Sequence, residues 1–486
     1  MTTTMNETRI EKDSMGQMPV PSDVLYGAST QRAVLNFPIS GRPVPEEIIL
    51  AYAMLKRAAA RANESLGKLP ALKAAAIDDA CGQILEGLTD RGGISRHFPI
   101  DIFQTGSGTS TNMNANEVIA NLVCLTNDAP IGSSKNAEYL SGDSAVHPND
   151  HVNMGQSSND TFPTAMHVAA AVAIHEKLLP AVRSLAEELE AKAAAWDDVI
   201  KIGRTHLADA TPIRLGQEFS GYASQMRHAE DRLHRALSVL SELAIGGTAV
   251  GTGINTHPEF SARVSERLSA ATGISFREAD NHFEANHAKD AYVEASGVLK
   301  TIAVSLSKIA NDVRWLGSGP RCGIGELKIP AIQPGSSIMP GKVNPVICEA
   351  VMMVSCQVVG NDAAITMGGL GGVGSLIDLN VAMPVMASNM IDSINLLTGA
   401  CDTFNSRLLK DLEPDRERCE ALIEGSLAMC TSLVPEIGYD ASAKLAYDAF
   451  AQGKTVRQVA LEQNLVSEAR LTELLDPRSM TMPDPV

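Results

Sequence analysis

Long stretches in which apolar residues recur at every third or fourth position constrain the fold of this chain most strongly. In residues 217–244 these positions are Phe219, Tyr222, Met226, Leu233, Leu237 and Leu240. In residues 288–316 they are Val298, Ile302, Leu306, Ile309 and Val313. This spacing is typical of an amphipathic helix. Helices this long cannot bury their apolar faces alone, so the pattern predicts an all-α fold with a long-helix bundle shared between subunits.

Similar patterns fill much of the remaining chain. They predict helices over residues 45–67, 72–88, 164–197, 346–359 and 384–409. Pro180 predicts a kink in the third of these helices. A chain of 486 residues is too long for a single core, so two to four domains are expected. Glu413-Pro414 breaks the helical pattern and opens a small helical domain at the end of the chain.

The composition narrows the classes of partner. With 44% hydrophobic but only 4% aromatic residues, the core must consist of Ala, Leu, Ile, Val and Met, which suits close-packed helices. The formal charge of −17 argues against nucleic acid or an anionic membrane surface. No run reaches the roughly 18 apolar residues of a membrane span. The first fifteen residues lack the apolar region of a signal peptide, so we expect a cytoplasmic protein. Because the formal charge is negative, any site that binds an anion must be a local concentration of hydrogen-bond donors.

The eight cysteines predict neither a disulfide framework nor a metal site. No two of them form a C-x-x-C pair, and no His/Cys cluster has zinc spacing. Scattered thiols of this kind indicate a reducing compartment, and their spacings give no support for an iron–sulfur cluster. We expect no metal and no organic cofactor.

The segment from Gly335 to Pro345 contains two hydroxyls, a lysine and an amide between two glycines and two prolines. Glycine allows positive φ, and proline removes a donor and restricts its neighbour, so the segment predicts a loop that presents side chains. It is not a P-loop, because the glycines are one residue too far apart and Val343 stands where a magnesium-binding hydroxyl belongs. Gly369, Gly371 and Gly374 form G-x-G-x-x-G, but a helix rather than a strand precedes them, so no dinucleotide site is expected.

Three further polar segments are candidates for chemistry. Residues 104–112 place small hydroxyl residues around glycines ahead of an apolar run, which predicts either a helix cap or a helix N-terminus that attracts an anion. Residues 147–160 hold two dense polar clusters, in which His151 is taken as structural. Residues 203–207 contain His206, a candidate general acid/base because histidine titrates near neutral pH. Glu349 would orient the His206 ring if the helix predicted after Pro345 approaches that ring.

These segments together resemble the fumarase/aspartase superfamily over nearly the whole chain. The matching stretches are residues 105–116, 147–163, 203–218 and 335–350. Within the superfamily, His206, Gly341 and Cys348-Glu349-Ala350 are similar to class II fumarate hydratases, where aspartases usually carry other residues. The resemblance implies a mostly α homotetramer with active sites built from three subunits. It also implies three domains, which we place at residues 1–154 (mostly helical), 155–411 (the long-helix bundle) and 412–486 (small and helical).

The resemblance implies reversible hydration of fumarate to L-malate through an aci-carboxylate intermediate, in the tricarboxylic acid cycle. Ser336 would be the base that removes the C3 proton of malate, and Lys342 and Asn344 would hold the carboxylate whose charge grows. His206 with Glu349 would handle the water. The matching substrate-binding positions are Ser107, Gly108, Thr109, Ser157, Ser158, Asn159 and Thr205, and His147, Asn149 and Asp150 match a secondary anion site.

Three departures from the family pattern concern helix contacts and turnover. Ser375 to Asn380 replaces the usual Gly-Asn-Phe-Glu-Leu-Asn, Met383 stands where many fumarases have Arg, and Ala208 stands where Gln is common. Two alternatives remain open. The same carboxylate-stabilising loop would serve an aspartate ammonia-lyase, and a helical scaffold could keep the fold without catalysis.

Overall fold

The computed structural model describes residues 7–483, and it is mostly helical. The chain forms two compact units, each made of three separate stretches of sequence. Unit 1 comprises Met1–Leu179, Arg232–Thr301 and Gln357–Leu397, and unit 2 comprises Pro180–Asp231, Ile302–Cys356 and Thr398–Val486. The predicted all-α class is confirmed, and within residues 7–483 the strands form four sheets of two strands each. The three predicted domains stay a prediction.

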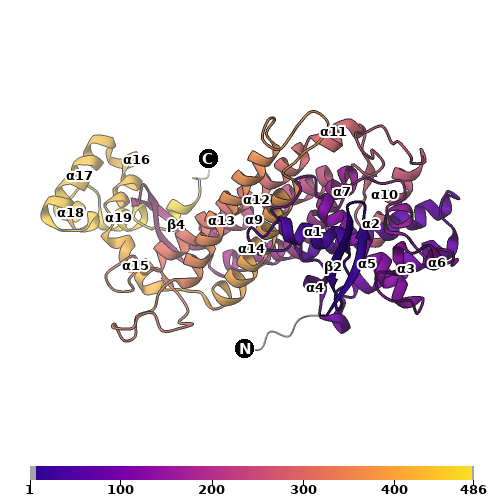
Figure 1. Cartoon of the computed structure of the whole chain (residues 1–486). Helices are drawn as coiled ribbons and strands as arrows, with labels where there is room; N and C mark the ends of the chain where they lie inside the picture. The colour runs from indigo at the N-terminus through magenta and orange to yellow at the C-terminus, as the bar shows by residue number, and fades with distance from the viewer. Residues whose placement is uncertain (1–6, 484–486) are drawn as a thin grey trace. The chain divides into compact units, whose positions relative to one another are not determined.

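The predicted long helices are present and are labelled in Figure 1. They are α9 (Leu215–Leu240), α12 (Asp290–Leu316), α13 (Val346–Gly369) and α14 (Met383–Arg407). Each contributes residues to both units. In unit 1, Asp362 of α13 accepts a 2.7 Å hydrogen bond from the Ser296 hydroxyl of α12. In unit 2, the Ser355 hydroxyl of α13 donates 3.0 Å to the Ala303 carbonyl of α12, so polar contacts join these two helices within each unit.

The helix predicted over residues 164–197 is longer and differently interrupted. It consists of α7 (Ser158–Ala173), a π-helical turn η4 (Ile174–Leu178) and α8 (Leu179–Ala195). It starts earlier because Ser157 and Asp160 form a capping box at its N-terminus. The irregularity precedes Pro180 rather than following it, because proline lacks the N–H that would bond back into the preceding turn.

The N-terminal part of unit 1 surrounds α5 (Thr109–Thr126), which is buried over most of its length. Around it lie the hairpin of β1 (Thr8–Asp13) and β2 (Gly16–Pro21), together with α1 (Ala28–Asn36), α2 (Glu46–Ser65), α3 (Ala71–Leu85) and α4 (Ile94–His97). Buried Glu117 of α5 accepts N–H groups of Gly27, Ser29 and Thr30 at 2.9–3.1 Å. The carboxylate therefore caps α1 from outside that helix.

Short elements complete unit 1. They are the 3₁₀ turns η1 (Thr89–Arg91) and η2 (Ser133–Lys135), α6 (Ala137–Leu140), the π-helical turn η3 (Pro148–Val152), the parallel pair β5 (Glu242–Leu243) and β6 (Arg277–Glu278), α10 (Phe260–Thr272) and α11 (His282–His287). Helix α10 packs on α2, which also packs on α3 and α7. This packing places α2 at the centre of the helices that support the hydroxyl-rich loops.

Unit 2 contains a hairpin that the sequence did not predict, where a loop between helices was expected. Strands β3 (Ile200–Thr205) and β4 (Ala208–Arg214) pair antiparallel. Buried Ile202 of β3 belongs to the apolar core formed by the C-terminal helices, with Leu433, Leu445 and Leu471. These helices are α15 (Arg416–Gly425), α16 (Val434–Ile437), α17 (Tyr439–Gln452), α18 (Val456–Glu462) and α19 (Glu468–Leu474), seen in yellow tones in Figure 1. The hairpin is thereby anchored at its base.

The remaining elements of unit 2 are short. They are the antiparallel pair β7 (Leu327–Lys328) and β8 (Glu413–Pro414), and the 3₁₀ turns η5 (Leu409–Asp411), η6 (Leu427–Leu433) and η7 (Ser479–Thr481). The segment from Gly335 to Pro345 lies in none of these elements and ends where α13 begins. It is therefore a loop, as the sequence predicted.

Candidate active site

In unit 1, the N-termini of α5 and α7 meet in a cluster of hydroxyls. Thr109, the first residue of α5, shares hydrogen bonds with the Ser107 hydroxyl at 2.8 Å and with the Ser158 hydroxyl of α7 at 2.7 Å. The predicted loop feeding a helix N-terminus is confirmed at Thr109. Both helix ends carry free N–H groups and a partial positive charge, so this hydroxyl cluster suits an anion such as a carboxylate.

Two glycines allow the close approach that forms the hydroxyl cluster. A Cβ on Gly106 would lie 1.8 Å from the Val381 carbonyl oxygen, which is backbone and cannot move aside. Gly108 has φ +72°, and a Cβ there would lie 1.9 Å from the Phe162 ring. No other residue fits either position without displacing the turn.

Beneath the hydroxyl cluster lies Lys56 of α2, a fully buried amine that the sequence analysis did not single out. Its Nζ donates to the side-chain oxygens of Asn112 (2.8 Å), Asn153 (3.0 Å) and Gln156 (2.9 Å). Burial lowers the pKa of Lys56 to about 7. A signal was available, because Lys56 follows Tyr52 by four residues and therefore lies on the buried face of α2.

Asp160 supports the same region from the first turn of α7. Its carboxylate accepts N–H groups of Ser157 (2.8 Å), Gly246 (3.0 Å) and Thr248 (2.8 Å). Burial raises the pKa of Asp160 to about 6, although these hydrogen bonds favour the charged form. The carboxylate therefore joins the start of α7 to the glycine-rich loop after β5. The predicted site residue Asn159 reaches the same loop, donating 2.8 Å to the Ala249 carbonyl.

The predicted secondary anion site forms the turn η3. His147 Nδ1 accepts the N–H groups of Asn149 (3.3 Å) and Asp150 (3.2 Å), so the ring caps the turn in its neutral form. Burial lowers the pKa of His147, which agrees with that role. His151 Nδ1 accepts the His147 N–H at 2.8 Å. This contact fits the structural role that the sequence analysis gave to His151.

In unit 2, the loop from Gly335 to Pro345 is closed by its own hydrogen bonds. Gly335 N–H donates to the Lys342 carbonyl at 3.0 Å, and Asn344 Nδ2 donates to the Gly335 carbonyl at 2.5 Å. Ser336 Oγ accepts the N–H groups of Ile338 (3.3 Å) and Met339 (3.0 Å). Two N–H dipoles thus point at the oxygen that the resemblance assigns as the base.

His206 and Leu207 form the two-residue turn at the tip of the β3–β4 hairpin. Both have positive φ, +58° and +59°, as a type I′ turn requires. Residues other than glycine are uncommon in this region, although histidine tolerates it better than leucine. His206 is exposed. The hairpin therefore presents the imidazole at its outermost point.

Ion pairs to buried side chains fix strand β3 of this hairpin. Arg204 binds the fully buried carboxylate of Glu326 through two hydrogen bonds of 2.9 and 3.0 Å. Lys201 Nζ lies 3.3 Å from Glu326 and 3.2 Å from Glu218. Arg204 directly precedes Thr205 and His206, so the network positions the strand that carries the predicted site residues. Sequence patterns assign charged residues to the surface, which explains why Lys201, Glu218 and Glu326 were missed.

Comparison with known proteins assigns the chain to a family. Residues 16–360 match the lyase family, and residues 429–482 match the fumarase C C-terminus. The chain is 49% identical over 476 residues to a class II fumarate hydratase of Neisseria meningitidis, covering 98% of this chain and 99% of that protein. It belongs to the class II fumarate hydratase family.

Further relatives agree with this membership. A class II fumarate hydratase of Corynebacterium glutamicum is 50% identical, over 97% of this chain and 94% of that protein. The crystal structure of class II fumarase from Schistosoma mansoni superposes with a TM-score of 0.91 at 38% identity, covering 99% of this chain and 100% of that one. The resemblance stated from the sequence is confirmed over nearly the full length.

Within this fumarate hydratase fold, the predicted site residues fall into two sets. Unit 1 carries Ser107, Gly108, Thr109, His147, Asn149, Asp150, Ser157, Ser158 and Asn159. Unit 2 carries Thr205, His206, Ser336, Lys342, Asn344 and Glu349. Among the residues the structure describes, His206 and Glu349 share no hydrogen bond or ion pair, and both are exposed. Their expected pairing stays a prediction. No group of three or more potential metal ligands converges anywhere between residues 7 and 483.

Proposed function

We propose that this chain catalyses the reversible hydration of fumarate to L-malate, as a hydro-lyase of the tricarboxylic acid cycle. The observation that carries the proposal is the closed loop from Gly335 to Pro345, where the Ser336 oxygen accepts two N–H groups. The loop occurs in a chain about half identical to fumarate hydratases. Removing the weakly acidic C3 proton of malate requires a base and a stabilised intermediate, and this loop offers candidates for both.

Ser336 is the proposed base. A serine hydroxyl is a weak base at neutral pH, so its deprotonated form needs nearby positive charge. The N–H groups of Ile338 and Met339 already point at its oxygen, and the Lys342 ammonium is carried by the same loop. Hydrogen bonds from donors favour a charged oxygen over a neutral one. The oxygen would take the C3 proton and return it in the reverse direction.

Loss of the C3 proton places additional negative charge on the adjacent carboxylate of malate. Lys342 and Asn344 are the proposed donors to that carboxylate. In the structure one N–H of Asn344 closes the loop on Gly335, so its second N–H would serve the substrate. The hydroxyls of Ser107, Thr109 and Ser158 would orient the carboxylates, as would Asn159 and Thr205. Fixing both ends of a small dicarboxylate holds C2 and C3 in line with the proton-transfer groups.

His206, oriented by Glu349, is the proposed group for the water. Protonating the departing hydroxyl of malate, or deprotonating water in the hydration direction, requires a group that changes charge near neutral pH. At the tip of the hairpin, the His206 ring is exposed. His147, Asn149 and Asp150 would form a separate anion site, whose exposed Asn149 side chain can still donate hydrogen bonds.

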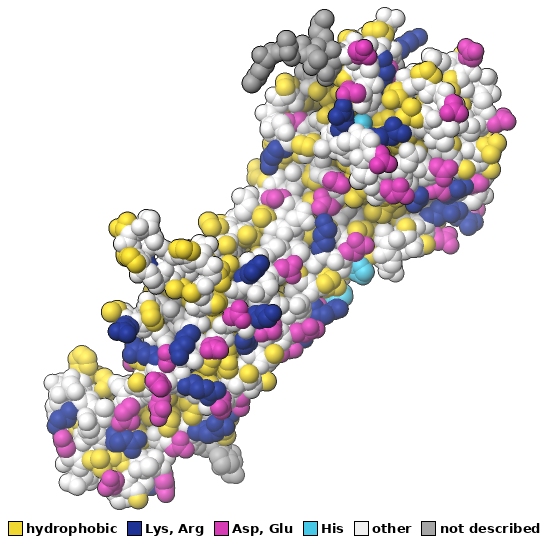
Figure 2. All heavy atoms as spheres, turned by 90° about the horizontal axis from the view of Figure 1, so that it is seen from below, with side chains coloured by type: hydrophobic (Ala, Val, Ile, Leu, Met, Phe, Trp, Pro, Cys, Tyr) yellow, Lys and Arg dark blue, Asp and Glu magenta, His cyan; other side chains and the backbone are white. Residues whose placement is uncertain are grey.

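We also propose that the enzyme is a cytoplasmic homotetramer whose active sites combine three subunits. Helix α13 is long and apolar enough to cross a membrane, yet only 33% of its apolar window is buried. The equally apolar Ser158–Ala195 is 67% buried. Met353, Val359 and Met367 of α13 are exposed, and hydrophobic side chains are visible among charged ones on the face in Figure 2. Helices of further copies would cover these residues.

The proposal is tested by incubating the purified protein with malate and EDTA while following absorbance in the fumarate band. Formation of fumarate is expected, and no change in absorbance would defeat the proposal. Parallel incubation with aspartate measures ammonia release, which should be slower by far. Light scattering should give a tetrameric mass, and full activity in a monomer would refute the shared site.

A further inference from the structure

Three arginines converge on a groove of unit 1 that is separate from the predicted site residues. The groove lies between α2, α3 and α10 and has a volume of about 560 Å³. Arg57 and Arg61 of α2, Arg267 of α10 and Asp78 of α3 supply its charged lining. Cavities of this size hold small organic molecules. The groove therefore gathers three guanidinium groups in a chain whose formal charge is −17.

The charges of this arginine groove are not balanced within it. Arg61 Nε lies 2.7 Å from Asp78, and Arg57 contacts the same carboxylate. Arg61 also reaches Glu64, outside the lining, at 2.9 Å. Arg267 forms no hydrogen bond or ion pair with any described residue, and its side chain is exposed. Three guanidinium groups therefore share the two carboxylates of Asp78 and Glu64, which leaves about one positive charge, that of Arg267, for a ligand.

The rest of the lining is apolar. It consists of Met54, Ala58, Leu85, Ala270 and Ala271. An apolar wall beside guanidinium groups suits a molecule with an apolar body and an anionic head, because the wall removes the body from water while the planar forks bind oxygens in pairs. A phosphate monoester carries a charge of about −1.5 to −2 at neutral pH, and its three oxygens can accept from Arg267 and from a flanking guanidinium at the same time.

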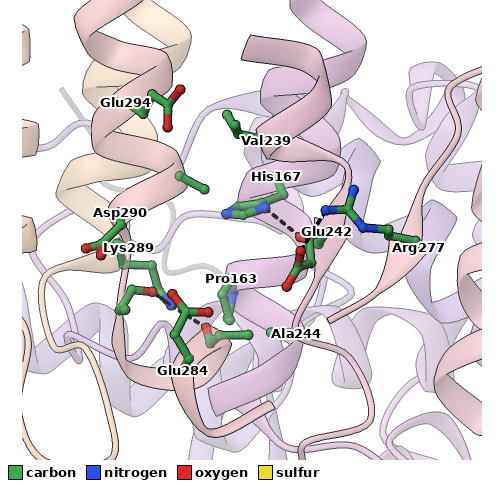
Figure 3. A pocket seen from close by; sticks show the side chains of 13 residues that line it. Pro163, His167, Val239, Glu242, Ala244, Arg277, Glu284, Lys289, Asp290 and Glu294 are labelled. Carbon is green, nitrogen blue, oxygen red and sulfur yellow. Dashed lines mark hydrogen bonds and ion pairs between the residues drawn. The ribbon is translucent and has the colours of Figure 1, made fainter. Parts of the chain in front are cut away.

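A second cavity of unit 1 has a lining whose arginine and lysine are already partnered (Figure 3). Its volume is about 230 Å³. Arg277 pairs with Glu242 at 2.7 Å, and the Lys289 ammonium donates to the carbonyls of Ala285, Asn286 and Ala288 at 2.7–3.2 Å. The lining also includes Glu284, Asp290 and Glu294. Its cations are already bound and carboxylates predominate, so this cavity does not suit an anion.

We propose that the arginine groove is a binding site for a small organic phosphate monoester with an apolar body. This site is distinct from the proposed dicarboxylate site and does not depend on the proposed function. Arg267 is the residue whose guanidinium is free to bind the phosphate, while Arg57 and Arg61 flank it from α2. Isothermal titration calorimetry of the full-length protein with phenyl phosphate tests the proposal. Three compounds serve as comparisons. Phenol has the aromatic ring without charge, inorganic phosphate has the charge without the ring, and benzoate has the ring with a single negative charge.

Phenyl phosphate should bind more tightly than each of the three comparison compounds. Arg267→Met should weaken phenyl phosphate binding by roughly tenfold or more, because charged hydrogen bonds are lost. The matched control is Arg263→Met, one turn earlier on α10, whose exposed guanidinium pairs with Glu259 outside the groove. This control should bind phenyl phosphate within about twofold of the unchanged protein.

Several results would overturn the proposal. One is an absence of binding by phenyl phosphate, and another is unchanged binding in Arg267→Met. Equal weakening in both variants would indicate general surface charge rather than this groove. Equal affinity for phenol or benzoate would show that the arginines do not recognise a phosphate. Circular dichroism checks that Arg267→Met is folded, which its exposed and unpaired side chain leads us to expect.

Discussion

The hydroxyls of Ser107, Thr109 and Ser158 in unit 1 bond to one another above buried side chains, whereas the loop around Ser336 in unit 2 is exposed over most of its length. The first set lies above Lys56 and is joined to the glycine-rich loop by Asp160. Among the described residues, the hydrogen bonds that close the second lie within its own loop, and its Lys342 and Asn344 line a cavity with other residues of unit 2. Hydrogen bonds to the rest of unit 1 therefore support the first set, whereas most of the second set is exposed.

This contrast distinguishes the residues proposed to bind the substrate from those proposed to transfer protons. Apart from Thr205 and the loop donors Lys342 and Asn344, the residues proposed to bind carboxylates lie in unit 1, where hydrogen-bonded amides and helix termini hold them. The residues proposed to move protons lie on an exposed loop and at a hairpin tip with positive φ. Backbone strain and exposure are common at positions that act on a substrate. Substitutions in the two sets should therefore differ in what they damage.

The largest expected effect is on catalysis, in the exposed set. Ser336→Ala should lower turnover by roughly a thousandfold or more and abolish exchange of the malate C3 proton with solvent. His206→Asn should slow hydration yet leave some exchange, because the carbanion can still form and return. NMR measures the exchange, and steady-state assays measure turnover. Both variants should keep the proposed tetramer and the thermal midpoint, since neither side chain is fully buried. Unchanged exchange in Ser336→Ala would move the role of base to another residue.

The next effect is on stability, in the buried set. Lys56→Met should lower the free energy of unfolding by about 3 kcal/mol, because the side-chain oxygens of Asn112, Asn153 and Gln156 each lose a hydrogen bond from a buried ammonium. The midpoint of urea unfolding, followed by helical circular dichroism, measures the loss. Lys68→Met is the control, since Lys68 is exposed just beyond α2. Equal urea midpoints for Lys56→Met and Lys68→Met would show that Lys56 does not stabilise the fold.

Asp160 gives the buried set a dependence on pH. Its pKa in the folded chain is about 6, above the ordinary value of 3.8, so the folded state holds the proton more tightly than the unfolded state. Its contribution to stability is therefore greatest below pH 4, falls as pH rises from about 4 to 6, and is on the order of 1 to 3 kcal/mol. Asp160→Asn should flatten this part of the unfolding curve. The control is Asp79→Asn, at an exposed position on α3, which should leave the pH dependence unchanged. If the pH dependence persists in Asp160→Asn, another group causes it.

The smallest effect concerns the hairpin tip. Leu207 has φ +59°, which glycine adopts without strain, so Leu207→Gly should raise stability by less than about 1 kcal/mol. Leu207→Ala keeps the Cβ and should show no such gain. Differential scanning calorimetry compares the two midpoints. A lower midpoint for Leu207→Gly would mean that the leucine side chain is covered in the assembled enzyme.

The sequence predicted the long helices well because their apolar period extends over many turns. It missed the β3–β4 hairpin, because the His206-Leu207 turn contains neither glycine nor asparagine, the residues that usually mark a two-residue hairpin turn. It also missed Lys56 and Glu326, because the sequence alone does not distinguish a charged residue in a buried network from one on the surface. Ser336 and His206 were found through their motifs, and their roles stay predictions. Whether His206 meets Glu349 depends on contacts that residue spacing does not encode.

Unit 1 is assembled from three stretches, and the last ends at Leu397. A ribosome adding about 5–20 residues per second reaches that point roughly 20 to 80 s after initiation. Until then, the first 179 residues wait without the segments that complete their unit. A chain still in synthesis therefore lacks residues that complete unit 1, and a chain truncated before residue 397 should be less stable than the full chain.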